Sequence, residues 1–290
     1  MEARLGKPFV EGDLALLIDP RERRYLVRLK KGQSHHTHIG AVPHVAIIGL
    51  EDGCRVVTQT GHEMTVLRPT LAEYTLKMKR SAQVIYPKDV GPMLVYADIF
   101  PGAKVLEAGV GSGALTMALL RAVGEHGRVV GQDIREDLGS QAVKNVKEFL
   151  GDMPNFSLTF GDVYEGTAET DFDRVVLDLP EPWRALDTVG TCLRQGGILL
   201  SYLPTVLQVH QLYLALARDV RYDFIESFEV LLRPWYMAPT SARPVHRMIA
   251  HTGFIVRALR CEPRKGYQPP AEEEGDLAVE SAEDAEEPGL

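Results

Sequence analysis

The chain has 290 residues, a formal net charge of −8, 45% hydrophobic residues and 25% charged residues, a composition typical of soluble globular proteins. No apolar run reaches the roughly 18 residues that a transmembrane helix needs, and no signal peptide opens the chain. The three cysteines, Cys54, Cys192 and Cys261, have the spacing of neither a disulfide framework nor a metal site. These features predict a cytoplasmic protein and argue against membrane proteins and disulfide-rich secreted domains.

Charge is unevenly distributed along the chain. Residues 261–290 carry ten acidic and two basic side chains, which account for the whole net charge, and this segment is predicted to be a disordered acidic tail. Residues 1–80 hold 13 basic and 9 acidic groups, and residues 231–260 hold five arginines and no acid. Two basic regions therefore flank an acidic middle. This pattern suits a polyanionic partner, although no segment is basic enough to identify a nucleic-acid module by itself.

Residues 1–75 are predicted to form a small N-terminal β-rich domain, because short apolar runs alternate with Gly and Asp turn signals. The runs are LALLID (14–19), YLVRLK (25–30), VAIIGL (45–50) and CRVVTQT (54–60). Residues 76–90 are predicted to be a linker into a larger domain that spans residues 76–260.

From residue 103 onward, predicted strands alternate with predicted helices, which indicates an α/β fold with a doubly wound, mostly parallel sheet. Strands are expected over 105–110, 128–133, 156–162, 174–179, 196–203, 228–235 and 251–260. Helices are expected over 113–123, 136–150, 184–194 and 205–218. No helix of normal length fits between the last two strands, so an antiparallel strand is expected at the end of the chain.

A glycine-rich turn joins the first strand of this larger domain to its first helix. The segment VLEAGVGSGALT places Gly109, Gly111 and Gly113 there, where glycine permits tight turns and close approach of a ligand. A nicotinamide dinucleotide site would show GxGxxG spacing around a bound pyrophosphate. Here the spacing is GxGxG and Glu107 precedes it, and an acid at that point would repel a pyrophosphate. A dehydrogenase is therefore disfavoured.

Three acidic residues belong to three successive predicted strands, whose carboxyl ends form the ligand crevice of such sheets. Glu107 could hold an ammonium group, Asp133 a ribose diol and Asp162 an adenine amine. Each acid taken alone is more readily explained as a helix cap or turn residue. The set fits a cationic ligand with ribose and adenine but no phosphate, which describes S-adenosylmethionine.

The fourth strand of the domain ends in VVLDLPEPW. Asp178 is therefore expected beside the carboxyl ends of the other strands, which we call the rim of the sheet. Pro180 and Pro182 fix their own backbone angles and bias the preceding residues toward extended conformations. The resulting stiff turn would hold Asp178 and Trp183 at the cofactor edge, and methyl transfer requires such alignment. The alternative is that the prolines only separate a strand from a helix that begins at Pro182.

Four segments together resemble the TrmI-type tRNA (adenine-N1)-methyltransferases, which modify adenosine 58 in the T-loop. They are VLEAGVGSGALT, DLPEPW, QVIYPKD (83–89) and RPVHRM with HTGF (243–254), and the resemblance extends over nearly all of residues 1–260. It implies a Rossmann-like class I methyltransferase fold with a small N-terminal β domain. It also implies S-adenosylmethionine as methyl donor, tRNA as substrate, a homotetramer and no metal.

The resemblance also implies roles for individual residues. Asp178 is similar to the family's catalytic carboxylate, and Tyr86 to a tyrosine close to the transferred methyl group. Cofactor-binding positions are Gln83, Glu107, Gly109, Gly111, Ser112, Gly113, Asp133, Asp162 and Asp178. The second strand departs from the family, which commonly has an aromatic residue and Glu where this chain has Gln132 and Asp133.

Position N1 of adenine lies on the Watson–Crick edge, so the target base must be extruded from folded tRNA. Aromatic candidates for its pocket are Tyr86, Trp183, Tyr202, Trp235 and Tyr236. Phosphate contacts are predicted for Arg21, Arg23, Arg24, Arg28, Lys30, Lys31, Arg243 and Arg247. The histidines His35, His36 and His38 lack the further ligands of a metal site, so metal binding is not expected.

Two other functions remain open. One is an S-adenosylmethionine-dependent methyltransferase of a protein or small molecule, which would not need the basic N-terminal region. The other is a non-catalytic tRNA-binding subunit, which would show a broken glycine loop or a lost Asp178, whereas both are present.

Overall fold

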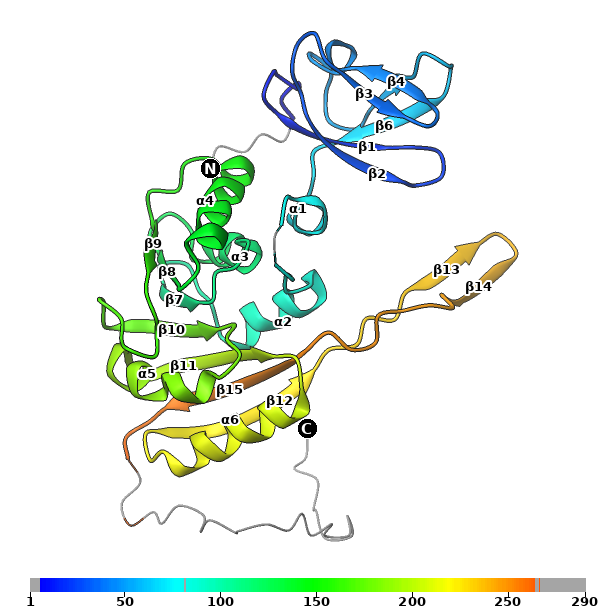
Figure 1. The fold of residues 1–290 in the computed structure, drawn as a ribbon. Helices are drawn as coiled ribbons and strands as arrows, with labels where there is room; N and C mark the ends of the chain where they lie inside the picture. Colours follow the sequence, from blue (N-terminus) through cyan, green and yellow to red (C-terminus); the bar gives the residue numbers. More distant parts are fainter. Residues whose placement is uncertain (1–5, 81, 264–265, 267–290) are drawn as a thin grey trace.

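The computed structural model describes residues 6–80, 82–263 and 266. It consists of an N-terminal β domain, a larger α/β domain and a two-stranded arm that projects from the α/β domain (Figure 1). Most of the predicted acidic tail, residues 264–265 and 267–290, lies outside the described residues. No helix in the described part of the chain combines the length and the hydrophobicity needed to cross a membrane.

The N-terminal domain contains a four-stranded antiparallel sheet of order β2-β1-β6-β5 and a separate hairpin, β3-β4. The strands are β1 (Leu14–Ile18), β2 (Arg24–Arg28), β3 (Ser34–Thr37), β4 (Gly40–Pro43), β5 (Cys54–Val57) and β6 (Glu63–Leu67). Alternation places Met64 and Val66 of β6 in the core, where they join Phe9, Leu17 and Leu29.

The apolar run VAIIGL is not a strand, contrary to the expectation that it contributes to the β-rich pattern. Its first residues belong to a 3₁₀ helix, η1 (His44–Ala46), and the carbonyl of His44 accepts hydrogen bonds from the N–H groups of Ile47 and Ile48. The backbone of this run therefore makes local hydrogen bonds and does not pair with a strand at these residues. Ile47 is fully buried in the domain core.

Two helices that the sequence did not predict connect the domains: α1 (Leu71–Lys77) and α2 (Pro87–Tyr96). A capping box between Thr70 and Glu73 begins α1. Its Tyr74 is fully buried, stacks on Phe149 with ring centroids 4.6 Å apart, and donates a hydrogen bond to Glu148. Helix α1 therefore anchors the N-terminal domain to the larger one.

The larger domain is built on a seven-stranded sheet of order β12-β15-β11-β10-β7-β8-β9. Its strands are β7 (Lys104–Ala108), β8 (Arg128–Asp133), β9 (Phe156–Phe160), β10 (Phe172–Leu177), β11 (Leu193–Leu203), β12 (Tyr222–Glu229) and β15 (Phe254–Arg260). Its helices are α3 (Ala114–Val123), α4 (Glu136–Leu150), η2 (Pro182–Ala185), α5 (Leu186–Cys192) and α6 (Val206–Arg218). The five strands from β11 to β9 are parallel, and β15 runs antiparallel to β11 and β12. The doubly wound α/β fold and the antiparallel final strand are thus confirmed.

The predicted strand over 228–235 is wrong. Strand β12 ends at Glu229, and the chain leaves the sheet to form an arm of two strands, β13 (Trp235–Ala238) and β14 (Ser241–Pro244). Residues 230–234 belong to no strand, and Pro234, which cannot donate to a sheet, directly precedes β13. The predicted helix over 184–194 also ends early, because Leu193 already belongs to β11.

Candidate active site

The glycine loop follows β7 and leads into α3, and its three glycines adopt positive φ angles of 86°, 55° and 82°. A Cβ on Gly109 would lie 2.1 Å from the carbonyl oxygen of Asp178, so glycine is required for the approach of the two strand ends. A Cβ on Gly113 would contact the backbone of Ala142 in α4. A Cβ on Gly111 would meet nothing within 4 Å, so this backbone faces open space that a ligand can occupy.

Asp133, at the end of β8, holds the glycine loop. Its carboxylate accepts a hydrogen bond from the N–H of Gly111 at 2.9 Å and another from the N–H of Arg135 at 2.8 Å. The side chain is buried. Asp133 therefore has a structural partner in addition to the ribose contact predicted for it, which stays a prediction.

Glu107, on β7, is a buried acid without a hydrogen-bond partner for either carboxyl oxygen among the described residues. Burial raises the pKa of Glu107 to about 8; Thr116, which lies near the carboxyl without making a hydrogen bond of normal geometry, opposes the rise, and the charges of Asp178 and Asp133 add to it. The hydroxyl of Ser112 in the loop is likewise buried and has no partner in the described part of the chain. Buried polar groups without a hydrogen-bond partner are costly and rare. The carboxyl of Glu107 and the hydroxyl of Ser112 therefore indicate a polar ligand beside the loop.

Asp178 follows β10, and its N–H donates to the carbonyl of Ala108 at 2.9 Å. Desolvation by the surrounding protein, and then the charge of Asp133, raise the pKa of Asp178 to about 7. The residue is nevertheless exposed to solvent, and water tempers this shift.

The double-proline turn after Asp178 leads into a short helix, and its role in aligning Asp178 and Trp183 with the cofactor stays a prediction. Pro182 does begin a helix, η2, as the alternative explanation held. The turn is also held from outside, because the side-chain amide of Gln208 in α6 donates to the carbonyl of Pro180 at 2.9 Å.

Three further predicted site residues lie in other segments of the chain. Asp162 follows β9, is half-buried, and accepts a hydrogen bond from the N–H of Tyr164 at 2.9 Å. Tyr86 is the N-cap of α2 and is half-buried, and Gln83 is exposed in the segment before it. The structure thus brings Glu107, Asp133 and Asp178 close enough to perturb one another, as expected for acids on neighbouring strand ends.

A buried network centred on Asp89 was not found from the sequence. Asp89 is fully buried, and its carboxylate accepts hydrogen bonds from Lys88 at 2.7 Å, from Thr252 at 2.6 Å and from Tyr202 at 3.3 Å. Lys88 also donates to the carbonyl of Val230 at 2.6 Å. The network joins α2, the end of β11 and the base of the arm. The one available signal was that Asp89 and Thr252 both fall in the motif segments QVIYPKD and HTGF.

Replacing Asp89 by Asn should destabilise the protein, because it leaves Lys88 buried without its counter-charge. Removing one partner of a buried ion pair costs about 3–5 kcal/mol. Urea unfolding of the variant would measure this loss in the free energy of unfolding. The matched control is Glu226→Gln, which removes a carboxylate whose partner is Arg257 on a more exposed pair and should cost less than about 1 kcal/mol. Equal effects of the two substitutions would contradict a stabilising role for the Asp89 network.

Several basic residues predicted to bind RNA pair with carboxylates. Arg23 contacts Asp19 at 2.7 Å, Arg24 contacts Glu73 at 2.9 Å, and Arg28 contacts Glu148 at 2.7 Å. The pairs of Arg24 and Arg28 join strand β2 to α1 and α4, so these two residues also position the N-terminal domain. In the arm, Arg243 stacks over the ring of Tyr236 at 5.0 Å. RNA binding by these residues remains a prediction.

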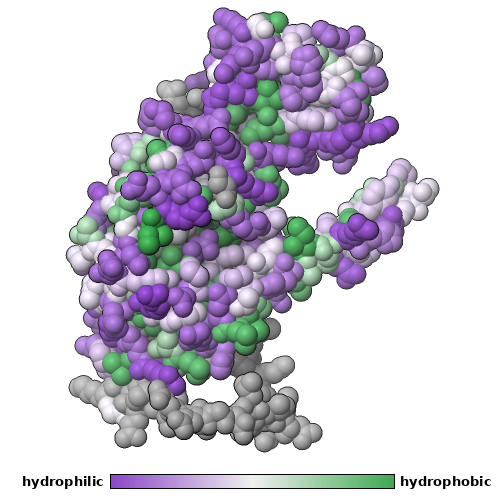
Figure 2. Space-filling view, in the orientation of Figure 1, coloured by the Kyte–Doolittle hydropathy of each residue, from purple (hydrophilic) through white to green (hydrophobic). Residues whose placement is uncertain are grey.

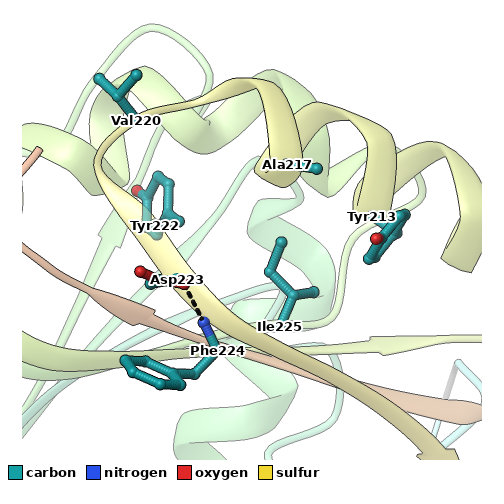
Figure 3. A pocket seen from close by; sticks show the side chains of 7 residues that line it. All are labelled: Tyr213, Ala217, Val220, Tyr222, Asp223, Phe224 and Ile225. Carbon is teal, nitrogen blue, oxygen red and sulfur yellow. Dashed lines mark hydrogen bonds between the residues drawn. The ribbon is translucent and has the colours of Figure 1, made fainter. Parts of the chain in front are cut away.

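Within residues 6–80, 82–263 and 266, no three His, Cys, Asp or Glu side chains are grouped so as to hold a metal ion. A cavity of about 370 Å³ lies between α6 and β12 and is lined by Tyr213, Tyr222, Phe224 and Ile225 (Figure 3). Tyr222 pairs with Arg260 at the end of the sheet opposite the glycine loop, so this cavity is remote from the acids. A second hollow of about 350 Å³ lies beside the ends of β8 and β9, next to Gln132 and Phe160.

Family models cover most of the described chain. Residues 63–252 match the family described as "tRNA methyltransferase complex GCD14 subunit", and residues 8–57 match "TrmI-like N-terminal".

Curated relatives extend over both domains. The "tRNA (adenine(58)-N(1))-methyltransferase TrmI" of Thermus thermophilus is 42% identical over 247 residues, which is 84% of this chain and 95% of the relative. The "tRNA (adenine(57)-N(1)/adenine(58)-N(1))-methyltransferase TrmI" of Methanocaldococcus jannaschii is 33% identical over 268 residues, covering 84% of this chain and 93% of the relative.

Two solved structures share the fold over most of the chain. An S-adenosylmethionine-dependent O-methyltransferase from Thermotoga maritima has a TM-score of 0.85 and 33% identity, over 89% of this chain and 96% of that one. The tRNA (m1A58) methyltransferase TrmI from Aquifex aeolicus has a TM-score of 0.78 and 28% identity, over 88% and 100%. The class I methyltransferase fold predicted from the sequence is confirmed.

Proposed function

Because the chain belongs to the TrmI-type family of tRNA (adenine-N1)-methyltransferases, we propose that it methylates N1 of adenosine 58 in the tRNA T-loop, with S-adenosylmethionine as donor. The observation that carries this proposal is the buried, unpaired carboxyl of Glu107 beside a ligand-accessible glycine loop and Asp178. The intact loop disfavours a non-catalytic subunit. Matches to tRNA enzymes over both domains disfavour a protein or small-molecule methyltransferase.

The residues around the glycine loop fit S-adenosylmethionine, which supplies an electrophilic methyl group on a cationic sulfonium. Gly111 leaves room for close approach, and Glu107 presents a carboxylate to a cationic ligand once it loses its proton. Asp133 and Asp162 offer acceptors for the ribose and the adenine amine. None of these groups would attract a phosphate, in keeping with a donor that has none.

Asp178 acts on the acceptor base. Neutral adenine N1 carries a lone pair, so no proton has to leave before it attacks the methyl group. The attack places positive charge on the adenine ring, and the carboxylate of Asp178 stabilises that charge and accepts a hydrogen bond from the 6-amino group. Tyr86, at the start of α2, is assigned to the wall of the base pocket.

A homotetramer is also part of the proposal. The arm exposes Trp235, Tyr236 and Met237, which are 54%, 48% and 70% accessible, and Figure 2 shows apolar surface where the arm leaves the body. A second copy of the chain would cover these residues. The number of copies comes from the family resemblance, which implies four. Light scattering should give the mass of a tetramer, and a Trp235→Ser, Met237→Ser double variant should give smaller assemblies. A monomeric wild-type protein would contradict this part of the proposal.

Methyl transfer to tRNA is the direct test of function. Labelled S-adenosylmethionine would be incubated with two unmodified tRNA transcripts, one with adenosine and one with guanosine at position 58. Label on the first transcript alone supports both the reaction and the site, and equal label on both points to another nucleotide. Absence of label despite cofactor binding would favour the protein, small-molecule or non-catalytic alternatives. Chelator should leave the activity unchanged, because the proposed reaction uses no metal.

Binding of S-adenosylmethionine is expected to strengthen as the pH rises toward 8. The pKa of Glu107 is raised to about 8, so the group is protonated at neutral pH and must lose its proton to meet a cationic ligand. Binding coupled to loss of one proton gains about tenfold in affinity per pH unit below the pKa. Titration calorimetry at pH 6, 7 and 8 measures this.

The Glu107→Gln variant is the control for that pH dependence. It should bind S-adenosylmethionine more weakly at pH 8 and with a flatter pH profile, because the amide has nearly the shape of the carboxyl and does not ionise. If the variant retains the wild-type pH slope, the proton comes from another group.

A further inference from the structure

Three cations follow one another at the end of α1: Lys77, Lys79 and Arg80. All three are exposed, and none forms an ion pair with another described residue. Between them Met78 is 5% exposed and packs in the core of the larger domain, which anchors the segment. We call Lys77, Lys79 and Arg80 the basic lip.

The basic lip is tied to the glycine loop. The side-chain amide of Asn145 in α4 donates to the carbonyl of Lys79 and to the carbonyl of Ser112, both at 2.9 Å. Asn145 is 1% exposed, so this bridge is buried. The segment continues toward Tyr86 at the start of α2, on the connection between the two domains (Figure 1). The lip therefore lies beside the proposed cofactor site and directly before the segment that carries Tyr86.

The chemistry of the cofactor does not explain these cations. S-adenosylmethionine is cationic and has no phosphate, and Asp133 and the ionised Asp178 make the site around the loop acidic. Those acids repel an RNA backbone at the point where its base must enter. Cations at the edge of the site offset that repulsion. Lys77 also suits the carboxyl end of a helix, but that role does not extend to Lys79 and Arg80.

We propose that the basic lip is a phosphate-binding site that holds the tRNA backbone next to the extruded nucleotide. This inference rests on the proposed function, and it names the contact through which the RNA is positioned. The arginines of β2 are less suited to the task, since Arg24 and Arg28 are already engaged with carboxylates. The lip has no carboxylate partner among the described residues, and its backbone is fixed to the glycine loop.

The test is a triple variant, Lys77→Gln, Lys79→Gln and Arg80→Gln, in the full-length protein. Binding of an unmodified tRNA transcript would be measured between about 50 and 300 mM salt. Over this range the release of counterions from the RNA makes its affinity for protein strongly dependent on salt. Each lost phosphate contact reduces the magnitude of the slope of log affinity against log salt by roughly 0.7–0.9, so loss of all three should reduce it by about 2 to 3. The affinity at 150 mM salt should fall about 10- to 100-fold, and the loss should appear in the KM for tRNA.

Two further variants separate charge from structure. The first replaces Arg121, Arg128 and Arg194 by Gln, which removes the same charge. Arg121 is exposed at the end of α3, and Arg128 and Arg194 lie at the starts of β8 and β11, at the end of the sheet opposite the glycine loop. This charge-matched control should change the salt slope of tRNA binding by less than half as much as the lip variant does. The second, Lys77→Arg, Lys79→Arg and Arg80→Lys, keeps the charges and should restore tRNA binding.

Three results would overturn the proposal. They are a salt slope equal to that of the charge-matched control, a fall in S-adenosylmethionine affinity that parallels the loss of tRNA binding, or failure of the charge-keeping variant to restore binding. Failure of the proposed function shows differently, because wild-type protein would then leave adenosine 58 unmethylated whatever the lip variants do.

Discussion

Replacing Asp178 by Ala is expected to lower kcat for tRNA methylation by about 10²- to 10³-fold, the loss that follows removal of one preorganised electrostatic group. The reason is that the reaction creates a positive charge on adenine beside this carboxylate. S-adenosylmethionine should still bind, because Gly111 and Glu107 belong to β7 and its loop and are unchanged. Single-turnover methylation and cofactor titration measure the two effects separately. Turnover close to wild type would show that Asp178 is not the catalytic carboxylate.

Two variants make this result specific. Asp178→Asn keeps a hydrogen-bond acceptor and removes the charge, so its residual activity divides the effect of Asp178 between the two. Glu181→Gln removes a carboxylate from the same turn, where Glu181 pairs with the exposed Arg184 at 2.9 Å, and should change kcat less than about twofold because surface pairs contribute little.

The pH dependence of the wild-type enzyme follows from the same residue. The pKa of Asp178 is raised to about 7, and the ionised form is the active one. At saturating S-adenosylmethionine, where protonation of Glu107 no longer limits cofactor binding, kcat/KM for tRNA should therefore fall as the pH drops through about 7 or, because water reaches the exposed carboxylate, somewhat below it. Asp178→Asn should lose this acid limb. A variant that keeps it would assign the limb to another group.

Short-range sequence patterns, the alternation of apolar strands with amphipathic helices, predicted the elements that carry the candidate cofactor site. The strand over 128–133 and the helix over 136–150 match β8 and α4, and alternation of strands with helices predicted that the acids would meet at one rim. This works because a parallel sheet collects the carboxyl ends of its strands on one side, whatever the loops do.

The segments that the sequence missed depend on distant partners or on proline. Helix α2 contains Gly91 and Pro92, which argue against a helix, yet Val90 and Met93 are buried against the core. The run over 228–235 has the composition of a strand, but Pro234 and the contact between Lys88 and Val230 direct it into the arm. That contact joins residues 142 positions apart, which no local pattern encodes.

The acidic residues of the candidate site were predicted from the sequence, but the buried hydrogen bonds around them were not. Acids at strand ends are visible in the sequence, because each lies in or just after an apolar run. The buried partners of Asp89 are not visible, since Tyr202 and Thr252 are separated from it by 113 and 163 residues. Asp133 is an intermediate case: its position was predicted, and its hydrogen bond to the glycine loop was not.

Two alanine substitutions in the glycine loop should differ in what they impair most: Gly109→Ala should mainly lower stability, and Gly111→Ala should mainly weaken cofactor binding. Gly109→Ala places a Cβ 2.1 Å from the carbonyl oxygen of Asp178 at a φ of 86°. Strain of this kind costs about 1–3 kcal/mol, and the backbone displacement needed to relieve the overlap costs about as much again. The free energy of unfolding should fall by several kcal/mol, and methylation should be lost because Asp178 moves.

Gly111→Ala is the matched partner, since its added Cβ meets no protein atom within 4 Å and only the positive φ of 55° is unfavourable. It should lower stability by about 1–2 kcal/mol, the usual cost of a left-handed residue. If a ligand occupies the open space, affinity for S-adenosylmethionine should fall more than tenfold, far beyond the change in stability. Urea unfolding and calorimetric titration of both variants test this. Unchanged affinity in Gly111→Ala would mean that the open face of the loop is not where the cofactor lies.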